Sequence, residues 1–179
     1  MVLFTRKDMV ESKRLWEGGI IKLRVDSLKS PGGEETIREV VEHNGGVVIA
    51  SETAEGKVLL VRQYRYALDI EILELPAGRI EAGENPFPAA QRELTEETGY
   101  AAKTWKELSR MYSAPGFCDE VLYLYHATDL SFQGKNLDFD EETDVVEVSL
   151  DEAWLMIADG RIRDAKTIAG IGILASLRK

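Results

Sequence analysis

The chain has 179 residues, and 32 acidic against 22 basic side chains give it a formal net charge of −10 at pH 7. This charge argues against nucleic acid as the main partner, because binding the phosphate backbone needs a basic face. No apolar run approaches the about 20 residues that span a bilayer. The single cysteine, Cys118, excludes an intrachain disulfide and a cysteine-based zinc site. The charged amino-terminal segment lacks the apolar centre of a signal peptide, so we expect a cytoplasmic protein without nucleic-acid or membrane partners.

The first half of the chain is predicted to consist of strands. Alternating residues over 18–28 and 36–43 flank the turn SPGGEE and predict a hairpin, which could form a small sheet of its own. Apolar, β-branched runs over 45–52 and 57–66, joined by TAEGK, predict a second hairpin. A further strand is expected over 70–78.

The first convincing helix is predicted from Asn85 to Thr98. Pro86 and Pro88 suit a first turn, where a missing amide hydrogen costs little, and Gly99 suits the position after the helix. Its apolar residues recur on one stripe, which can face a sheet.

The second half is predicted to add strands and two closing helices. Strands over 104–113 and 121–130 flank the loop APGFCDE, and a short strand follows over 145–150. Helices are expected over 150–162 and 164–179. Many strands with one central helix and two terminal helices predict a layered α/β (α+β) domain.

Three glutamates of the central helix, Glu93, Glu96 and Glu97, lie within one and a half turns. Like charges three and four residues apart weaken a helix, so something must offset the repulsion. Arg92 adjoins them and can hold a carboxylate by a bidentate contact. Magnesium also suits such a cluster, because it binds one or two carboxylates together with substrate phosphates. On spacing alone, a solvated acidic face is the commoner explanation.

The wider stretch GRIEAGENPFPAAQRELTEETGY resembles the signature of the Nudix hydrolases. The final aliphatic position is Tyr100 here, a small departure at a packing residue. Several charged residues at fixed separations make this a specific motif, and it favours the metal site. The fixed positions of the signature are all met: Gly78, Glu84, Arg92, Glu93, Glu96, Glu97 and Gly99.

The resemblance extends to the ADP-ribose pyrophosphatase branch of that family. It rests on VRQYR and ELPAG upstream, on SAPGFCDE with Pro115 downstream, and on REVVEH and DEETDVVEV. It implies the Nudix α/β/α sandwich with an additional N-terminal antiparallel sheet. It also implies a homodimer with shared active sites, in which region 1–43 is exchanged between subunits and 44–179 forms the hydrolase domain.

By this resemblance, Glu93 and Glu97 are the principal Mg²⁺ ligands, with the backbone carbonyl of Ala77 as a further ligand. Glu96 is expected to bind a second ion, directly or through water. Two or three ions are implied, and Mn²⁺ is a possible substitute. They would bridge the pyrophosphate and orient a water for attack.

The resemblance also implies which residues support the metal ligands and which one acts as the general base. Arg92 is expected to orient Glu93 or its neighbours, and Glu84 to brace the loop before the helix. The general base is expected on the late loop DFDEETD, where Glu141 aligns best and Glu142 is a close second. A solvated turn is the alternative for this loop.

Five residues are expected to bind substrate. Arg65 suits a phosphate or ribose phosphate, and Gly116 lets backbone amides approach phosphate. Arg38 and Glu39 match positions that contact the nucleotide across the dimer in relatives. Glu120 is expected to orient the terminal ribose or a metal water, and it remains a third candidate for the base.

The resemblance implies Mg²⁺-dependent hydrolysis of the pyrophosphate of ADP-ribose to AMP and ribose 5-phosphate. A broader nucleoside diphosphate sugar hydrolase, acting on GDP-mannose or ADP-glucose, is the first alternative. A non-catalytic Nudix domain that senses a nucleotide is the second, and the intact signature argues against it.

Overall fold

The computed structural model describes residues 4–135 and 143–178 of the chain. It contains two compact units, one of Met1–Gly45 with Tyr112–Val121 and one of Gly46–Met111 with Leu122–Lys179. The loop around Pro115 thus packs with the N-terminal strands, although it is distant from them in sequence. Exchange of region 1–43 between subunits stays a prediction.

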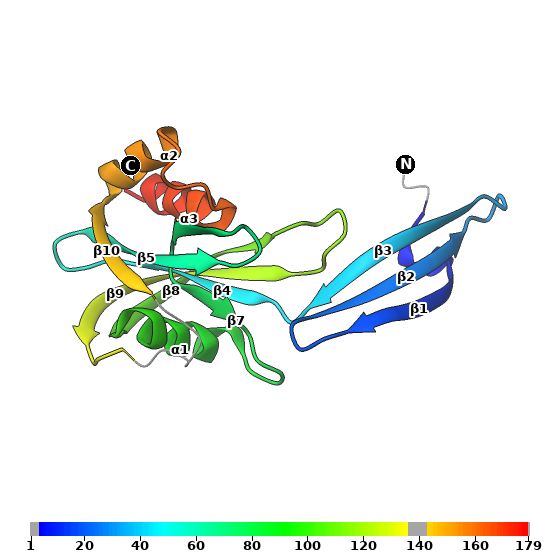
Figure 1. The fold of residues 1–179 in the computed structure, drawn as a ribbon, viewed down its shortest axis with the longest axis horizontal. Helices are drawn as coiled ribbons and strands as arrows, with labels where there is room; N and C mark the ends of the chain where they lie inside the picture. Colours follow the sequence, from blue (N-terminus) through cyan, green and yellow to red (C-terminus); the bar gives the residue numbers. More distant parts are fainter. Residues whose placement is uncertain (1–3, 136–142, 179) are drawn as a thin grey trace. The chain divides into compact units, whose positions relative to one another are not determined.

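The first unit is built on a three-stranded antiparallel sheet in the order β1-β2-β3 (Figure 1). The predicted hairpin is confirmed as β2 and β3. The first strand was not predicted, because all nine of its residues are exposed and its sequence lacks a buried, alternating face. The elements are a 3₁₀ turn (Arg6–Asp8), β1 (Met9–Glu17), β2 (Ile21–Lys29) and β3 (Glu35–His43).

The loop between residues 112 and 121 is hydrogen-bonded to β3. The amide of Val41 donates to the carbonyl of Phe117 (2.8 Å), and the amide of Asp119 donates to the carbonyl of Val41 (3.1 Å). The amide of His43 donates to the Asp119 carboxylate at 2.9 Å. These bonds place the candidate residues of the loop beside those of β3.

The second unit has two sheets between layers of helix (Figure 1). A four-stranded sheet has the order β7-β4-β9-β8, and a three-stranded sheet has the order β10-β5-β6. One apolar core lies under α1, and another lies under α2 and α3, as the predicted α/β/α sandwich requires. The elements are β4 (Gly46–Ser51), β5 (Lys57–Arg65), β6 (Ile70–Glu74), β7 (Ala77–Arg79), α1 (Pro86–Thr98), β8 (Tyr100–Tyr112), β9 (Val121–Phe132), β10 (Asp144–Ser149), α2 (Leu150–Ala158) and α3 (Ala165–Ser176).

The second predicted hairpin is wrong. β4 pairs with β7 and, in parallel, with β9, whereas β5 pairs with β6 and β10. Near their connection, an isolated bridge joins Glu52 to Val58, and the amide of Thr53 donates to the carbonyl of Lys57 at 2.9 Å. Every residue of β4 is buried, so this strand takes partners on both edges in the middle of its own sheet.

The strand predicted over 70–78 is broken in two at Leu75 and Pro76. Proline cannot donate to a sheet ladder, so β6 ends before it and β7 begins after it in the other sheet. The Pro76 carbonyl instead accepts from the amide of Ile49 at 2.8 Å. This break brings Ala77 and Gly78 to α1.

The helix ends follow their glycines. Gly99 closes α1 with φ of 77°, a left-handed conformation that glycine adopts without strain, as its sequence position predicts. α2 ends at Ala158, earlier than predicted, and the left-handed Gly160 follows (φ 82°). None of the helices in the described part of the chain combines the length and apolar character needed to cross a membrane.

Candidate active site

The acidic helix α1 buries two of its glutamates. Glu93 is 8% exposed and Glu97 is 3% exposed, although they lie on a helix whose other buried residues are mostly small or apolar. Their spacing of four residues puts both carboxylates on one side of α1. A buried carboxylate is unfavourable without partners, so the contacts made here decide what the cluster can do.

Arg92 offsets the repulsion within the cluster. Its Nη1 donates to Glu93 Oε1 at 2.7 Å and to Glu96 Oε2 at 2.9 Å. Its Nε and Nη2 donate to the two oxygens of Glu84 at 3.2 and 3.0 Å, and Nη2 also reaches the carbonyl of Arg79 at 3.0 Å. One guanidinium therefore binds three carboxylates, where the sequence suggested one.

Glu84 joins this network to the loop before α1. Its Oε2 accepts from the amide of Glu81 at 3.0 Å as well as from Arg92. The hydrogen bond from Arg92 is the main cause that lowers the pKa of Glu84, and the same bond raises the pKa of Arg92. The side chain thus holds the loop between β7 and α1, which agrees with the bracing role expected for it.

The backbone of β7 lies against the two buried carboxylates. The amide of Ala77 donates to Glu97 Oε2 at 2.9 Å. A Cβ built on Gly78 would lie 1.9 to 2.1 Å from the carboxylate atoms of Glu93. Only glycine leaves room for this contact, which explains why the signature begins with one.

The donors present suit a hard divalent cation. Mg²⁺ takes oxygen ligands and commonly uses one or two carboxylates, with water and substrate phosphates completing its octahedron. Glu93 and Glu97 supply two such carboxylates beside the close-approaching backbone of Ala77 and Gly78. Within residues 4–135 and 143–178, no group of three or more His, Cys, Asp or Glu side chains forms a metal cage. The full ligand set of Ala77, Glu93, Glu96 and Glu97 stays a prediction.

The candidate bases Glu141 and Glu142 lie outside the described residues. Of the described residues that flank them, Thr143 is hydrogen-bonded to the C-terminal part of α1, and Lys135 is hydrogen-bonded to Thr143. Thr143, which is buried, donates from Oγ1 to the carbonyl of Glu97 at 2.9 Å, and Lys135 Nζ donates to the carbonyl of Thr143 at 2.5 Å.

Arg65, expected to bind substrate, forms an ion pair within the second unit. Its Nε donates to Glu74 Oε2 at 2.8 Å, and Nη2 lies 2.6 Å from the same oxygen. Glu74 is 2% exposed and also pairs with Lys166. Neither Glu74 nor Lys166 was singled out from the sequence: Glu74 opens the stretch ELPAG without a role of its own, and Lys166 lies 92 residues further along the chain.

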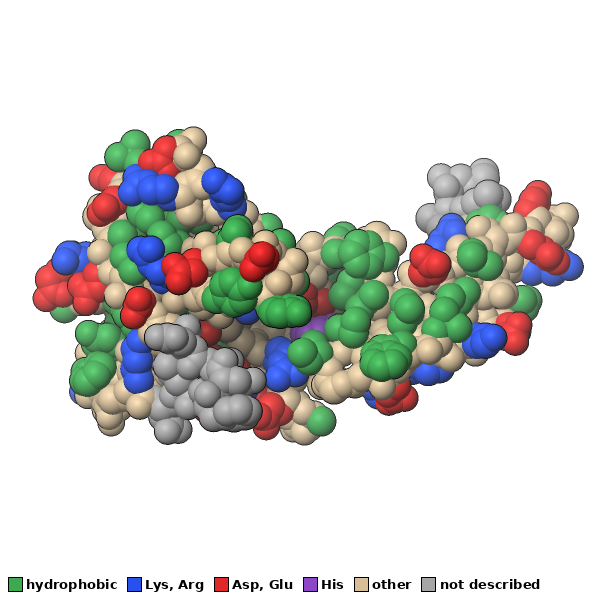
Figure 2. Space-filling model, viewed as in Figure 1, with side chains coloured by type: hydrophobic (Ala, Val, Ile, Leu, Met, Phe, Trp, Pro, Cys, Tyr) green, Lys and Arg blue, Asp and Glu red, His purple; other side chains and the backbone are tan. Residues whose placement is uncertain are grey.

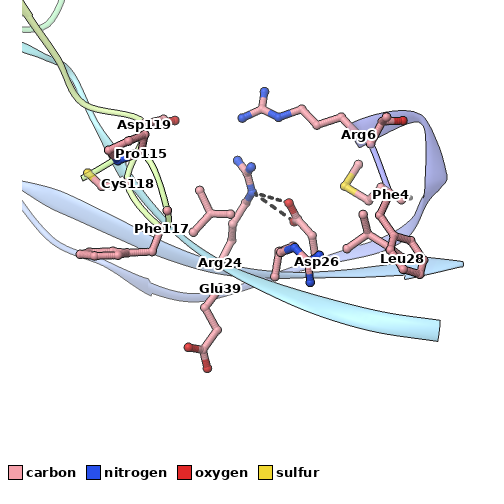
Figure 3. A pocket seen from close by; sticks show the side chains of 15 residues that line it. Phe4, Arg6, Arg24, Asp26, Leu28, Glu39, Pro115, Phe117, Cys118 and Asp119 are labelled. Atoms are coloured by element: carbon pink, nitrogen blue, oxygen red, sulfur yellow. Dashed lines mark hydrogen bonds and ion pairs between the residues drawn. The ribbon is translucent and has the colours of Figure 1, made fainter. Parts of the chain in front are cut away.

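In the first unit, a pocket of about 260 Å³ includes Arg38, Glu39 and Gly116 in its lining (Figure 3). Arg24 and Asp26 form an ion pair inside it, and Glu39 points the other way from them (Figure 3). The Nη1 of Arg38 donates to its own strand, at the hydroxyl of Thr36 and the carbonyl of Ile37.

Two residues that line this pocket, Arg24 and Asp26, were not identified from the sequence. Asp26 is 5% exposed and binds both Arg24 and the hydroxyl of Ser12, and the latter bond is the main cause that lowers its pKa. A charged pair at alternate positions of β2 was the available signal.

Glu120 pairs with Nδ1 of His43 at 3.2 Å, so this histidine has a partner among the candidate residues.

Known proteins resemble this chain over most of its length. Residues 42–171 match the model of the NUDIX domain. The chain is 40% identical over 174 residues to the methanol dehydrogenase activator of Bacillus methanolicus, covering 96% of this chain and 94% of that protein. It is 38% identical over 167 residues to the ADP-ribose pyrophosphatase of Bacillus subtilis, covering 92% and 90%. It is 34% identical over 145 residues to the GDP-mannose pyrophosphatase of Yersinia enterocolitica, covering 75% of each.

A solved structure shows the same fold. The crystal structure of an ADP compounds hydrolase matches with a TM-score of 0.83 and 20% identity, over 94% of this chain and 92% of that one. The predicted fold class is therefore confirmed, including its additional N-terminal sheet. With the domain matched over most of its length and relatives of about 40% identity along nearly all of it, the chain belongs to the Nudix family of pyrophosphohydrolases.

Proposed function

We propose that the protein hydrolyses the pyrophosphate bond of ADP-ribose to AMP and ribose 5-phosphate, with Mg²⁺. The observation that carries the proposal is the pair of buried carboxylates, Glu93 and Glu97, held against the backbone of β7. A relative 38% identical is named ADP-ribose pyrophosphatase, and Pro115 and its loop favour the same substrate.

The residues of the site have different roles in this reaction. When bound, Mg²⁺ supplies neutralisation of the pyrophosphate charge and activation of water. Glu93 and Glu97 would hold it, while Arg92 fixes the Glu93 carboxylate and draws Glu96 to the same guanidinium. Glu141 or Glu142 would take the proton of the attacking water.

A broader nucleoside diphosphate sugar hydrolase is the second candidate. A GDP-mannose pyrophosphatase shares 34% identity with the chain, and the contacts proposed for Arg65 and Gly116 address only the pyrophosphate that all such substrates share. The base and the sugar must therefore be distinguished by experiment.

A hydrolysis screen with Mg²⁺ tests the proposal. We expect kcat/KM for ADP-ribose to exceed the values for GDP-mannose, UDP-glucose, NADH and ATP by about tenfold or more, which is about 1.4 kcal/mol of discrimination. A sample stripped with chelator and then reloaded with Mg²⁺ or Mn²⁺ is the control. Equal values across the diphosphate sugars would favour the broad hydrolase. No hydrolysis of any substrate would favour a regulatory role, the class that the name of the B. methanolicus relative denotes.

We also propose a homodimer whose active sites are shared through Arg38 and Glu39. The first unit exposes several large apolar side chains, and Figure 2 shows hydrophobic side chains gathered over it. Such a surface is typical of a subunit interface. The exposed side chains are Met9, Val10, Leu15, Trp16, Ile20, Ile21, Ile37, Tyr112 and Phe117.

Subunit complementation tests the shared site. We expect Arg38→Ala/Glu39→Ala and Glu97→Gln each to lose most activity at low ADP-ribose concentration. Co-expressed as a mixed dimer, they should regain up to about a quarter of wild-type activity, because one site then contains every intact residue. Recovery no greater than the sum of the separate activities, or a monomer in sedimentation equilibrium, would contradict the proposal.

A further inference from the structure

The buried carboxylate of Glu74 joins two cations from distant parts of the chain. Glu74 is the last residue of β6 and is 2% exposed. Its Oε2 accepts from Nε of Arg65 at 2.8 Å, and its Oε1 accepts from Nζ of Lys166 at 2.5 Å. Each cation thus has its own oxygen, and the charge of the buried group is compensated on both sides.

Lys166 is itself held in place by the first turn of α3. Its Nζ lies 3.0 Å from Asp164 Oδ2, and Asp164 caps α3 by accepting from the amide of Thr167 at 2.9 Å. The fully buried Thr167 hydroxyl accepts from the amide of Leu75, the residue after Glu74, at 2.8 Å. The start of α3 is therefore bound to two consecutive residues of the chain that leads to β7.

These contacts leave one edge of Arg65 turned away from Glu74. The guanidinium uses Nε and Nη2 on Glu74, and the side chain is 39% exposed. Gln63 lies two residues earlier on the same side of β5. Its buried Nε2 has no hydrogen-bond partner among the residues that the structure describes. The exposed edge of Arg65 is a planar, charged donor that an anionic ligand can still reach.

We propose that Glu74 and Lys166 are positioning residues, which fix the guanidinium of Arg65 for the phosphates of the substrate. The inference rests on the proposed function. Lys166 occupies one carboxylate oxygen, so Arg65 can bind only the other and keeps its second edge outward. Without Lys166, both oxygens of Glu74 would be open to a bidentate contact, which would turn Arg65 toward the protein.

The kinetics of single and double variants test this role. We expect Lys166→Met to raise KM for ADP-ribose about five- to tenfold with kcat within about twofold, and Arg65→Ala to raise KM further. The double variant should exceed Arg65→Ala by less than about twofold, because Lys166 acts through Arg65. Glu74→Gln keeps the shape of the side chain but removes its charge, and we expect it to raise KM by a similar factor. It serves as the second test if Lys166→Met folds poorly.

Arg178→Met is the matched control. Arg178 follows the other end of α3 and pairs with Glu52 at 2.9 Å, so the variant removes an ion pair of similar kind without touching Glu74. Its KM should equal that of the wild type, and thermal unfolding of each variant records losses of stability separately.

Two results would overturn the inference while the wild type remains active. One is an unchanged KM in both Lys166→Met and Glu74→Gln, and the other is a fully multiplicative effect of Lys166→Met and Arg65→Ala on KM. A wild type that hydrolyses no diphosphate sugar would remove the proposed function and this inference together.

Discussion

Replacing Glu97 by glutamine is expected to lower kcat for ADP-ribose about 1,000-fold or more and to leave the fold intact. The substitution removes one of the two buried carboxylates proposed to hold Mg²⁺, and with it the charge that attracts the cation. The amide oxygen of glutamine can still accept from the amide of Ala77. Loss of a negative charge four residues from Glu93 also relieves repulsion within α1, so Tm should be unchanged or higher.

Steady-state kinetics and a thermal melt, with and without Mg²⁺, measure both effects. Glu107→Gln is the control, since Glu107 pairs only with the exposed Arg110 among its hydrogen bonds in the described structure. Its kcat should match the wild type. Near-normal turnover by Glu97→Gln would contradict the metal assignment for that residue.

Gly78→Ala is expected to reduce kcat at least about 100-fold and to destabilise the protein by about 1–3 kcal/mol. The new Cβ would lie 1.9 to 2.1 Å from the Glu93 carboxylate, a separation that no structure tolerates, so either β7 or Glu93 must move. Both movements displace a proposed metal ligand and disturb the contact of Glu93 with Arg92.

Urea unfolding and kcat measurements check this result against Gly172→Ala. Gly172 lies inside α3 with no atom within 4 Å of a built Cβ, so alanine there should stabilise the protein by about 0.5–1 kcal/mol. A Gly78→Ala protein with wild-type kcat would mean that the close approach of β7 to Glu93 has no part in the reaction.

Local features, such as the ends of α1, were predicted from the sequence more accurately than the pairing of the strands. Pro86 and Gly99 fix the bounds of α1, because each acts on the backbone of its own neighbourhood. The partners of β4 and β5 were predicted wrongly, since two adjacent apolar runs carry no information about which sheet each strand joins.

The same limit applies to the charged side chains. Arg92 was expected beside one carboxylate, and it also contacts Glu96 one helical turn further on and Glu84 in the loop before α1. Of these, the contact with Glu84 needs the loop geometry. The pairing of Glu74 with both Arg65 and Lys166 could not be predicted, because the Lys166 contact needs the position of α3 against β6. Such contacts depend on tertiary structure, which residue spacing does not encode.

The parallel pairing of β4 with β9 has a consequence for synthesis on the ribosome. Gly46 to Ser51 pair with Leu122 to Ala127, so β4 emerges long before its parallel partner has been translated. The side chains of β4 are all apolar or small and are buried in the folded protein, so they remain unpaired with β9 in the nascent chain until that strand has been synthesised. Closure of this sheet is therefore a late event, and the exposed strand is the segment of the growing chain that a chaperone would most usefully cover.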